Sequence, residues 1–329
     1  MRERRGPDFL GIGAQKAATT WLWRNLAANP GVWLHPRVKE FHYFDDREEL
    51  LAQTMRGRLR GRSRADVRWR RRVRDRMARP SFGGLAWDRR FFFGRPSDEW
   101  YLSLFDVAGD RIAGDMTPDY LALPRRDIEL AARLLPEARL ILMVRHPLER
   151  LWSAAAFFRG KEGRRTWQEM PRETVLRFLD APVNRRLTDY GGALRRWGEH
   201  YDARRIFVGF TIDVQLHPRA LLGAVSEFLG VDPVFDETLL GERINWTANR
   251  TMPGWAASHL ARTTADDIDA FDVIIGGHAG WWRHSARALA GMRDDETVEY
   301  PLTDGPLWEK WVAGGGSAAY SSGTLASIG

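Results

Sequence analysis

The sequence predicts an α/β fold in which a central parallel sheet is flanked by helices within a single domain. Short apolar runs suited to buried strands alternate along the chain with segments of helical periodicity, which is the pattern of strands joined by crossover helices. The run at 139–144 is almost continuously apolar, as in a strand buried on both faces. With 329 residues, 44% of them hydrophobic, the chain can bury a substantial core.

The N-terminal part is predicted to begin with a strand, a loop and a helix. Residues 9–13 form a short apolar run that ends in glycine. A helix is predicted over 21–28, because Thr19 or Thr20 can cap it and Asn29-Pro30 closes it. A second short strand is expected at 32–34 and a helix at 99–108.

The second half predicts further strand and helix units. After the strand at 139–144, Pro147 is well placed to open a helix to about 158, because the N–H that proline lacks would be unpaired there. Helices are predicted over 188–201 and 219–229, with a buried strand at 206–210 between them. The domain is expected to span 1–313. Its Gly/Ser/Ala-rich continuation, 314–329, predicts a flexible tail.

Most of the positive charge falls in one segment. Residues 56–79 contain twelve arginines and two acidic residues, in a chain whose net charge is only +7, so the rest of the protein is slightly acidic. The segment lies in a basic insertion at about 47–96, and 65–78 has helical character with Val67, Val73 and Met77 as a thin apolar set. A nucleic-acid arm, a patch for an acidic substrate or anionic membrane, and a solvated insertion all fit this pattern.

Composition excludes several classes of protein. The chain has no cysteine, which rules out disulfide scaffolds, thiolate zinc sites and cysteine nucleophiles. No apolar run reaches 18 residues, so no membrane span is predicted. The charged N-terminus is followed by an apolar run too short for a secretory leader, which indicates a cytoplasmic protein.

The loop between the first strand and helix has the composition of a phosphate cradle. A strand-to-helix junction offers free backbone N–H groups and the positive end of the helix dipole to an anion. Lys16 adds a charge, and Thr19 and Thr20 add hydroxyl donors. A Walker A motif is absent, because alanines follow Lys16, and the third glycine of a dinucleotide fingerprint is missing. An ordinary tight turn would look the same.

Two further groups of residues suit chemistry on a phosphorylated ligand. Arg145 follows the 139–144 strand, at the end where open α/β sheets bind ligands, and Ser153 lies two turns into the next helix. Glu40, beside Lys39 and near His42, forms a plausible general-base site. Taken singly, the first group is equally typical of an arginine that pairs with Glu149 and binds no ligand. The group around Glu40, taken singly, is more typical of a surface charge pair.

In this order, the motifs resemble those of the sulfotransferases that use 3′-phosphoadenosine-5′-phosphosulfate (PAPS), nearest to the heparan-sulfate type and its bacterial relatives. The matching stretches are Gln15-Lys16-Ala17-Ala18-Thr19-Thr20, Lys39 to Phe44, Trp100-Tyr101 with Phe105, Gly114 to Tyr120, Arg145 to Ser153, and Tyr190 with Leu194 and Trp197. The similarity extends over about 9–255. Three departures stand out. Ala18 replaces a glycine, Met116 stands where relatives often have lysine, and the cofactor-closing loop is matched only loosely by 243–250.

The resemblance implies a P-loop-like sheet and transfer of a sulfuryl group from PAPS to an acceptor hydroxyl or amine. It implies Glu40 as general base, with Lys16, Lys39 and His42 as catalytic partners. It places the cofactor on a set of residues that comprises Gln15, Lys16, Ala17, Ala18, Thr19, Thr20, Arg145, Ser153, Asn249 and Arg250. No metal is expected. The acceptor is expected to be a small molecule, lipid or carbohydrate, with no nucleic-acid partner.

Two alternatives remain at this point. A P-loop-type kinase or other nucleotide-binding enzyme would need Mg²⁺ ligands and a Gly-Lys-Ser/Thr cradle. A non-catalytic nucleic-acid-binding protein would use the 56–79 segment, and its binding would depend steeply on salt.

Overall fold

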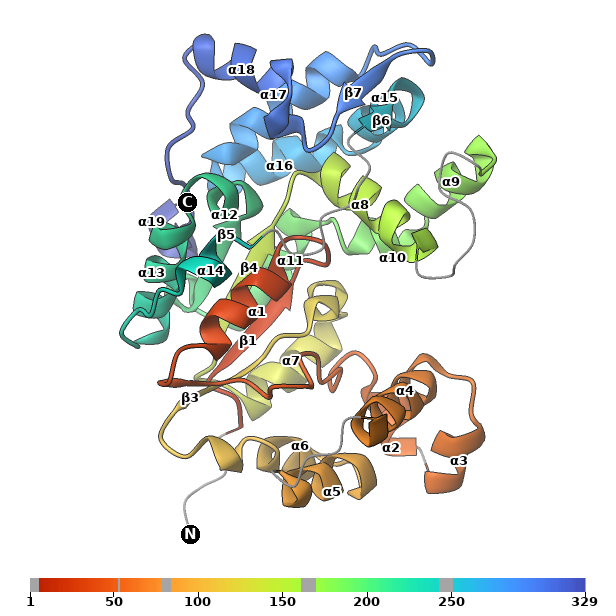
Figure 1. Ribbon diagram of the computed structural model, residues 1–329, viewed down its shortest axis with the longest axis vertical. Coiled ribbons are helices and arrows are strands. Elements are labelled where there is room, and N and C mark those ends of the chain that lie inside the picture. Colours follow the sequence, from red (N-terminus) through yellow and green to blue (C-terminus); the bar gives the residue numbers. More distant parts are fainter. Residues whose placement is uncertain (1–5, 53, 79–83, 161–169, 243–250, 329) are drawn as a thin grey trace.

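The computed structural model describes residues 6–52, 54–78, 84–160, 170–242 and 251–328. A six-stranded sheet in the order β2-β3-β1-β4-β5-β8 runs through the middle of the molecule (Figure 1). Its strands are β1 (Phe9–Gly13), β2 (Val32–Trp33), β3 (Ile112–Asp115), β4 (Arg139–Val144), β5 (Ile206–Phe210) and β8 (Gly323–Thr324). The first five are parallel, and β8 pairs antiparallel with β5. The predicted α/β class with a mostly parallel sheet is confirmed.

The helices surround this sheet and form a group at each end of the molecule (Figure 1). Those in the first part are α1 (Thr19–Ala27), α2 (Arg47–Ala52), α3 (Met55–Arg60), α4 (Arg64–Ala78), α5 (Leu85–Phe93), α6 (Asp98–Ser103) and α7 (Arg125–Leu134). Those in the middle are α8 (Pro147–Gly160), α9 (Arg172–Leu179), α10 (Pro182–Arg186), α11 (Tyr190–Gly198), α12 (Thr211–Leu216), α13 (Pro218–Leu229) and α14 (Glu237–Leu240). The last are α15 (Gly254–Thr263), α16 (Ala265–Ile275), α17 (His278–Leu289), α18 (Pro306–Ala313) and α19 (Leu325–Ile328), with a small antiparallel pair, β6 (Thr251–Pro253) and β7 (Thr297–Glu299).

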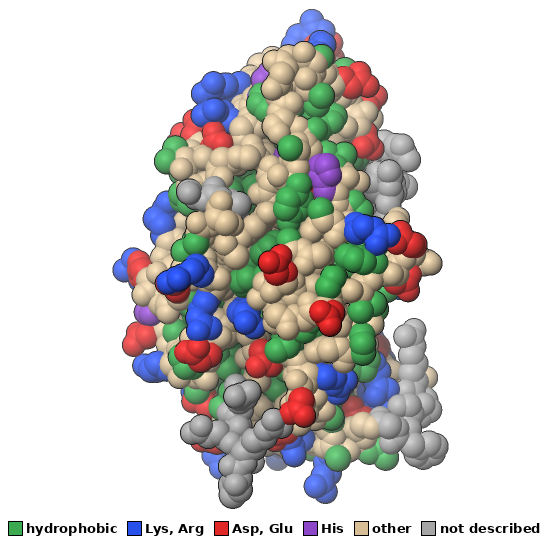
Figure 2. All heavy atoms as spheres, turned by 90° about the vertical axis from the view of Figure 1, so that its left-hand side faces the viewer, with side chains coloured by type: hydrophobic (Ala, Val, Ile, Leu, Met, Phe, Trp, Pro, Cys, Tyr) green, Lys and Arg blue, Asp and Glu red, His purple; other side chains and the backbone are tan. Residues whose placement is uncertain are grey.

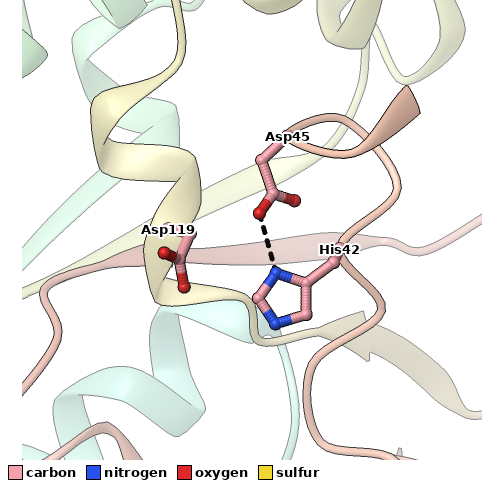
Figure 3. A group of neighbouring side chains, drawn as sticks. All are labelled: His42, Asp45 and Asp119. Carbon is pink, nitrogen blue, oxygen red and sulfur yellow. Dashed lines mark hydrogen bonds and ion pairs between the residues drawn. The ribbon is translucent and has the colours of Figure 1, made fainter. Parts of the chain in front are cut away.

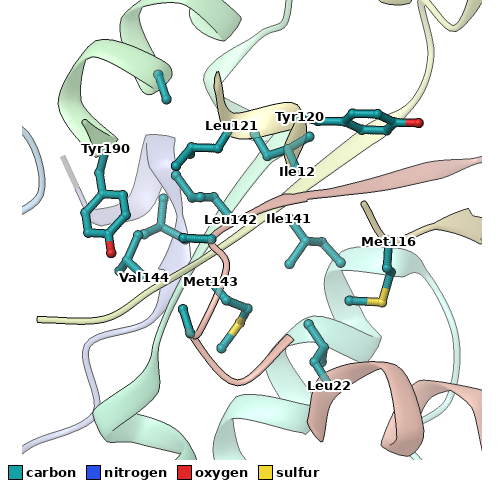
Figure 4. Packing of buried hydrophobic residues seen from close by; sticks show 14 of the residues in the cluster. Ile12, Leu22, Met116, Tyr120, Leu121, Ile141, Leu142, Met143, Val144 and Tyr190 are labelled. Atoms are coloured by element: carbon teal, nitrogen blue, oxygen red, sulfur yellow. The ribbon is translucent and has the colours of Figure 1, made fainter. Parts of the chain in front are cut away.

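The central strands form because their side chains are apolar on both faces and both faces are covered. All residues of β1 and β5 are buried, as are those of β4 after Arg139. Residues 141–144 pack against side chains from other elements, among them Ile12, Leu121 and Tyr190 (Figure 4). The predicted strands at 9–13, 139–144 and 206–210 therefore agree with the structure. The sequence reading missed β3, which has only four residues.

Helix ends follow local chemistry. The helix predicted over 188–201 is shorter, because Asp189 caps α11 by accepting a hydrogen bond from the N–H of Gly192 at 2.7 Å. The helix expected at 99–108 divides into α6 and a 3₁₀ turn, Asp106–Ala108. A second 3₁₀ turn, Pro118–Ala122, follows β3 and lies against β1.

The basic insertion folds into helices that pack on one another at one end of the molecule (Figure 1). Polar groups make several of its contacts: the Trp69 indole N–H donates to the carbonyl of Phe92 at 3.0 Å, and Arg76 pairs with Asp88 at 2.6 Å. The predicted apolar set is wrong in part, because Val67 and Met77 are exposed while Val73 packs against the core. Trp69, which is partly buried, packs against the core together with Val73.

Part of 314–329, the segment predicted to be a flexible tail, contacts the sheet. β8 extends the sheet, and the N–H of Ser322 donates to Asp213 at 2.9 Å. Asp213 also accepts from His278 at 2.8 Å, and all three side chains are buried. Because a buried carboxylate needs hydrogen-bond donors, Asp213 gives this segment a defined contact with the body of the domain.

Basic and acidic side chains are interspersed on the face shown in Figure 2, as expected for a body that is nearly neutral outside the insertion. Within the described residues, no helix has both the length and the apolar character needed to cross a membrane.

Candidate active site

One cleft of about 1050 Å³ gathers most of the residues that the sequence singled out. It lies where β1, β3, β4 and β5 end, at the carboxyl edge of the parallel strands, which is where open α/β sheets bind ligands. The predicted residues that line it are Gln15, Lys16, Ala18, Thr19, Thr20, Lys39, Glu40, His42, Arg145 and Ser153. Ala17 is different: its side chain is fully buried and its N–H donates to the carbonyl of Ala14. Asn249 and Arg250 lie outside the described residues.

The first turn of α1 opens toward this cleft. Ala18 precedes the helix and has no side-chain group to cap it, so the N–H groups of the first turn are available to a ligand. Lys16 and Ala18 both have left-handed backbone conformations, with φ of 67° and 58°. The matching family motif has glycine at the position of Ala18, and glycine adopts this conformation without steric cost.

Lys39 connects the helix terminus to the candidate base. Its Nζ lies 3.0 Å from Oγ1 of Thr19, 3.3 Å from Oγ1 of Thr20 and 3.4 Å from Oε1 of Glu40. The lysine side chain is only 18% exposed. Burial lowers the pKa of Lys39, while the negative charge of Glu40 opposes that shift. The ammonium group of Lys39 therefore contacts both the start of α1 and the carboxylate of Glu40.

Glu40 is held in its ionised form. Burial favours the neutral acid, but the hydrogen bond from His42 and the positive charges of Lys39, His42 and Arg72 outweigh burial and lower the pKa of Glu40 to about 2. The closest approach between His42 and Glu40 is 3.4 Å, from Nε2 to Oε2. A carboxylate is thus available at neutral pH, although its intrinsic basicity is low.

His42 lies beside the carboxylates of Asp45 and Asp119 (Figure 3). Its Nδ1 is 2.7 Å from Oδ2 of Asp45, and Asp119 lies close to both and accepts a hydrogen bond from the Gln15 amide at 2.8 Å. Burial disfavours the charged ring, but the hydrogen bonds to Asp45 and Glu40 raise the pKa of His42 to about 9. Among the described residues, His42, Asp45 and Asp119 are the group whose spacing suits a metal, yet an imidazolium has no lone pair to offer one.

A buried carboxylate holds the loop that carries Glu40 and His42. Asp115, fully buried at the end of β3, accepts hydrogen bonds from the hydroxyls of Tyr101, Thr117 and Tyr120 at 2.7–2.9 Å. The N–H of Phe41 also donates to Thr117 Oγ1, at 3.0 Å. Burial raises the pKa of Asp115 to about 6, although these hydrogen bonds favour the charged form.

Met116 does not face the cleft. Its side chain is 1% exposed and packs against Gly11, where a Cβ atom would lie 2.9 Å from the methionine Cγ. A lysine that replaced Met116 would therefore project toward the core in this backbone. In place of a lysine at position 116, the positively charged side chains in this part of the cleft are Lys39, His42 and the arginines of α4.

Arg145 is fixed by three neighbours. Its Nε donates to Glu149 at 2.8 Å, its Nη1 to the carbonyl of Lys16 at 3.3 Å, and its guanidinium lies over the ring of Tyr300 at 5.3 Å. Arg145 also shares a side-chain hydrogen bond with Tyr300, and it lines the cleft. Ser153 is nearly buried in the same wall, next to Tyr300.

Arg150, the second arginine of the same motif, has a structural position. It is completely buried, and it donates to the Thr188 hydroxyl at 2.8 Å and to the carbonyl of Asn184 at 2.9 Å. These bonds tie α8 to the α10 segment. Arg150 is not among the residues that line the cleft.

Several cleft residues escaped the sequence reading. Tyr300 comes from a segment without a recognised motif, and Thr211 directly follows β5. Arg64, Arg68 and Arg71 reach the cleft from the insertion. The signal for these three in the sequence is their spacing, which puts them on one face of a helix.

Comparison with known proteins identifies the family. Residues 7–237 match the model of the Sulfotransferase family, and the chain belongs to that family. No curated protein matches the sequence. A sulfotransferase from Alicyclobacillus acidocaldarius has a similar structure, with 20% identity and a TM-score of 0.57 over 84% of this chain and 98% of that one. The sulfotransferase domain of the Synechococcus PCC 7002 olefin synthase has 21% identity and a TM-score of 0.47 over 75% and 80%. The first likeness supports the fold.

The conformation of Ala18 leads to a stability prediction. We expect Ala18→Gly to raise the free energy of unfolding by about 1 kcal/mol, because glycine removes the Cβ strain of the left-handed conformation. Ala270→Gly, at an exposed position within α16, should instead lower it by about 0.5–1 kcal/mol. Chemical denaturation of both variants checks this, and a loss of stability in Ala18→Gly would contradict it.

The imidazolium of His42 predicts a pH dependence of stability. Because folding raises the pKa of His42 from 6.5 to about 9, its stabilising contribution is complete below pH 6.5 and is lost as the pH rises through 9. The stability difference between the wild type and His42→Gln should therefore shrink by about 3 kcal/mol between pH 6 and pH 9.5. Denaturation at both pH values measures it, with exposed His200→Gln as the control. If the stability difference between the two proteins is the same at both pH values, His42 is not held in its charged form by the folded protein.

Proposed function

We propose that the protein transfers a sulfuryl group from PAPS to an acceptor hydroxyl or amine, with Glu40 as general base. The observation that carries this proposal is the chain of contacts from the first turn of α1 through Lys39 to Glu40. An anion bound at the helix terminus and a proton acceptor would then share one cleft, as in-line group transfer requires.

The cleft suits a donor that carries two separate phosphate groups. The first turn of α1, Lys16 and the threonine hydroxyls would hold the 5′-phosphosulfate end. The guanidinium of Arg145 and the Ser153 hydroxyl, on another wall of the same cleft, would hold the 3′-phosphate. When bound, PAPS supplies the sulfuryl group, and its 5′-phosphate is the leaving group.

The residues of this chain would share the work of transfer. Glu40 accepts the proton of the acceptor hydroxyl as that oxygen bonds to sulfur and the bond from sulfur to the phosphate oxygen breaks. Lys16 and Lys39 stabilise the negative charge that develops on the leaving side. His42, charged and hydrogen-bonded, orients Glu40 and keeps it ionised, so no metal ion is required for proton removal.

A P-loop-type kinase is the less supported alternative. The loop before α1 has alanines after Lys16, where such enzymes have Ser or Thr. The two ring nitrogens of His42 contact Asp45 and Glu40, so neither is left to bind a metal ion. A small molecule, lipid or carbohydrate remains the expected class of acceptor.

The proton-acceptor role makes Glu40→Gln the first test. We expect turnover with radiolabelled PAPS, on an acceptor found by screening, to fall by about 10²–10⁴-fold, because the amide cannot take a proton. Affinity for 3′-phosphoadenosine-5′-phosphate (PAP), measured by calorimetry, should change less than about twofold. Glu48→Gln, at an exposed carboxylate on α2, is the control. Near-normal turnover in Glu40→Gln would show that another group is the base.

The Arg145 fork predicts selectivity for the 3′-phosphate. Arg145→Lys keeps a cation beside buried Glu149 but loses the planar guanidinium, which can donate two hydrogen bonds to one phosphate group. PAP should therefore bind about tenfold more weakly. Binding of adenosine 5′-phosphate, which lacks the 3′-phosphate, should change less than about twofold. Calorimetry on both nucleotides, with exposed Arg125→Lys as control, decides the matter. Equal losses for the two nucleotides would remove Arg145 from the 3′-phosphate site.

A further inference from the structure

One wall of the cleft is built from the basic insertion. Arg64, Arg68 and Arg71 of α4 line it, together with Glu40 and His42. The three arginines follow a spacing of four and then three residues, which places them on the same face of the helix. We call this set the arginine wall. Neither the proposed donor site nor the proton transfer uses it.

The arginine wall is held in place and is not a free arm. Trp69 and Arg76 anchor α4 on α5 through their contacts with Phe92 and Asp88. Arg72 donates a hydrogen bond to the backbone carbonyl of Glu40, so the helix contacts the segment that carries the candidate base. A ligand that touches this face of α4 would therefore lie near Glu40.

The arginine wall carries positive charge that the protein balances only in part. Arg68 pairs with Asp46. Burial and the neighbouring Arg68 lower the pKa of Arg72 to about 10, which still leaves it charged at neutral pH. Arg64 and Arg71 are exposed to the cleft, and no acidic group among the described residues pairs with either. Neighbouring like charges repel, so an anion bound here would relieve that repulsion.

Another part of the same cleft is apolar. Its lining comes from α9, α10 and the residues beside them: Phe178, Ala181, Val183 and Leu187. These helices lie apart from α4 in the molecule, so the two linings belong to different sides of the cleft (Figure 1). We call this set the apolar wall. A ligand that fits both walls has an apolar part and an anionic part.

Resting on the proposed function, we propose that the acceptor is an amphiphilic anion. Its apolar body packs on the apolar wall, its carboxylate, sulfate or phosphate group binds Arg64 and Arg71, and its hydroxyl or amine reaches Glu40. The arginines would thus select the acceptor, while the donor binds through α1 and Arg145. Two arginine contacts to one anionic group are also geometrically selective.

Binding of simple amphiphiles tests this class without knowledge of the natural acceptor. Octanoate, octyl sulfate and octyl phosphate are compared with uncharged octanamide, which has the same chain, and with acetate, which lacks it. Dissociation constants are measured by calorimetry on the full-length protein, alone and with saturating PAP. The three anions also show which anionic group the arginine wall prefers. We expect at least one to bind about tenfold more tightly than both octanamide and acetate, with PAP present or absent.

Matched variants assign the binding to the arginine wall. Arg64→Gln with Arg71→Gln should bring the affinity of the octyl anions to that of octanamide and leave octanamide itself unchanged. Arg60→Gln with Arg74→Gln removes the same charge from exposed positions outside the cleft lining, and it should keep the preference. Val183→Ser should weaken every octyl ligand and leave acetate unchanged.

The outcomes separate this inference from the proposed function. Equal affinity for anionic and uncharged ligands, or a preference that survives loss of Arg64 and Arg71, overturns the amphiphilic acceptor even if PAP binds as proposed. Competition between PAP and the octyl anions also overturns it, because the chain would then occupy the donor site. If PAP fails to bind, the proposed function fails, and the octyl series on the protein alone still decides whether the arginine wall recognises anions.

Discussion

The buried carboxylate of Asp115 is the interaction on which the candidate site depends. It stands at the end of β3, has no exposure to solvent, and collects hydroxyl donors from three side chains of which two, Thr117 and Tyr120, belong to the turn that follows. The third, Tyr101, comes from α6. Because an unpaired buried carboxylate is very costly, these donors must stay in place, and the loop after β2 is positioned against them. The location of Glu40 relative to the sheet follows from that constraint.

Charges in the cleft are arranged so that each ion holds its neighbour in a defined state. The contacts of His42 with Asp45 and Glu40 keep the ring protonated, and the cations around Glu40 keep that side chain ionised. Lys39 lies where burial opposes its charge, yet it is bonded to the carboxylate and to the hydroxyls at the start of α1. Such coupled groups titrate together, so a change at any one of them alters the others.

The sequence predicted the sheet well because its central strands are apolar on both faces and leave a continuous signal. It missed β3, whose four residues are too few for periodicity and include glycine and aspartate. Composition also gave no sign that Ser322, in the glycine-rich tail, donates a hydrogen bond to buried Asp213. Three segments that line the cleft could be singled out because each carries its polar residues within a short stretch: the loop before α1, the Lys39 to His42 segment and the Arg145 to Ser153 helix start.

What the sequence alone determined is therefore the order of the elements, the family resemblance and the identity of the residues in the donor and base motifs. Which of those residues meet was decided by the tertiary structure. Parallel strands bring their carboxyl ends to one edge, so segments more than a hundred residues apart line a single cleft. The role of the basic insertion was also undecided in the sequence, because a run of arginines has the same composition in a free arm and in a docked helix. Only the packing of Trp69, Arg72 and Arg76 turns one face of α4 toward Glu40, and this long-range contact has no counterpart in the local pattern.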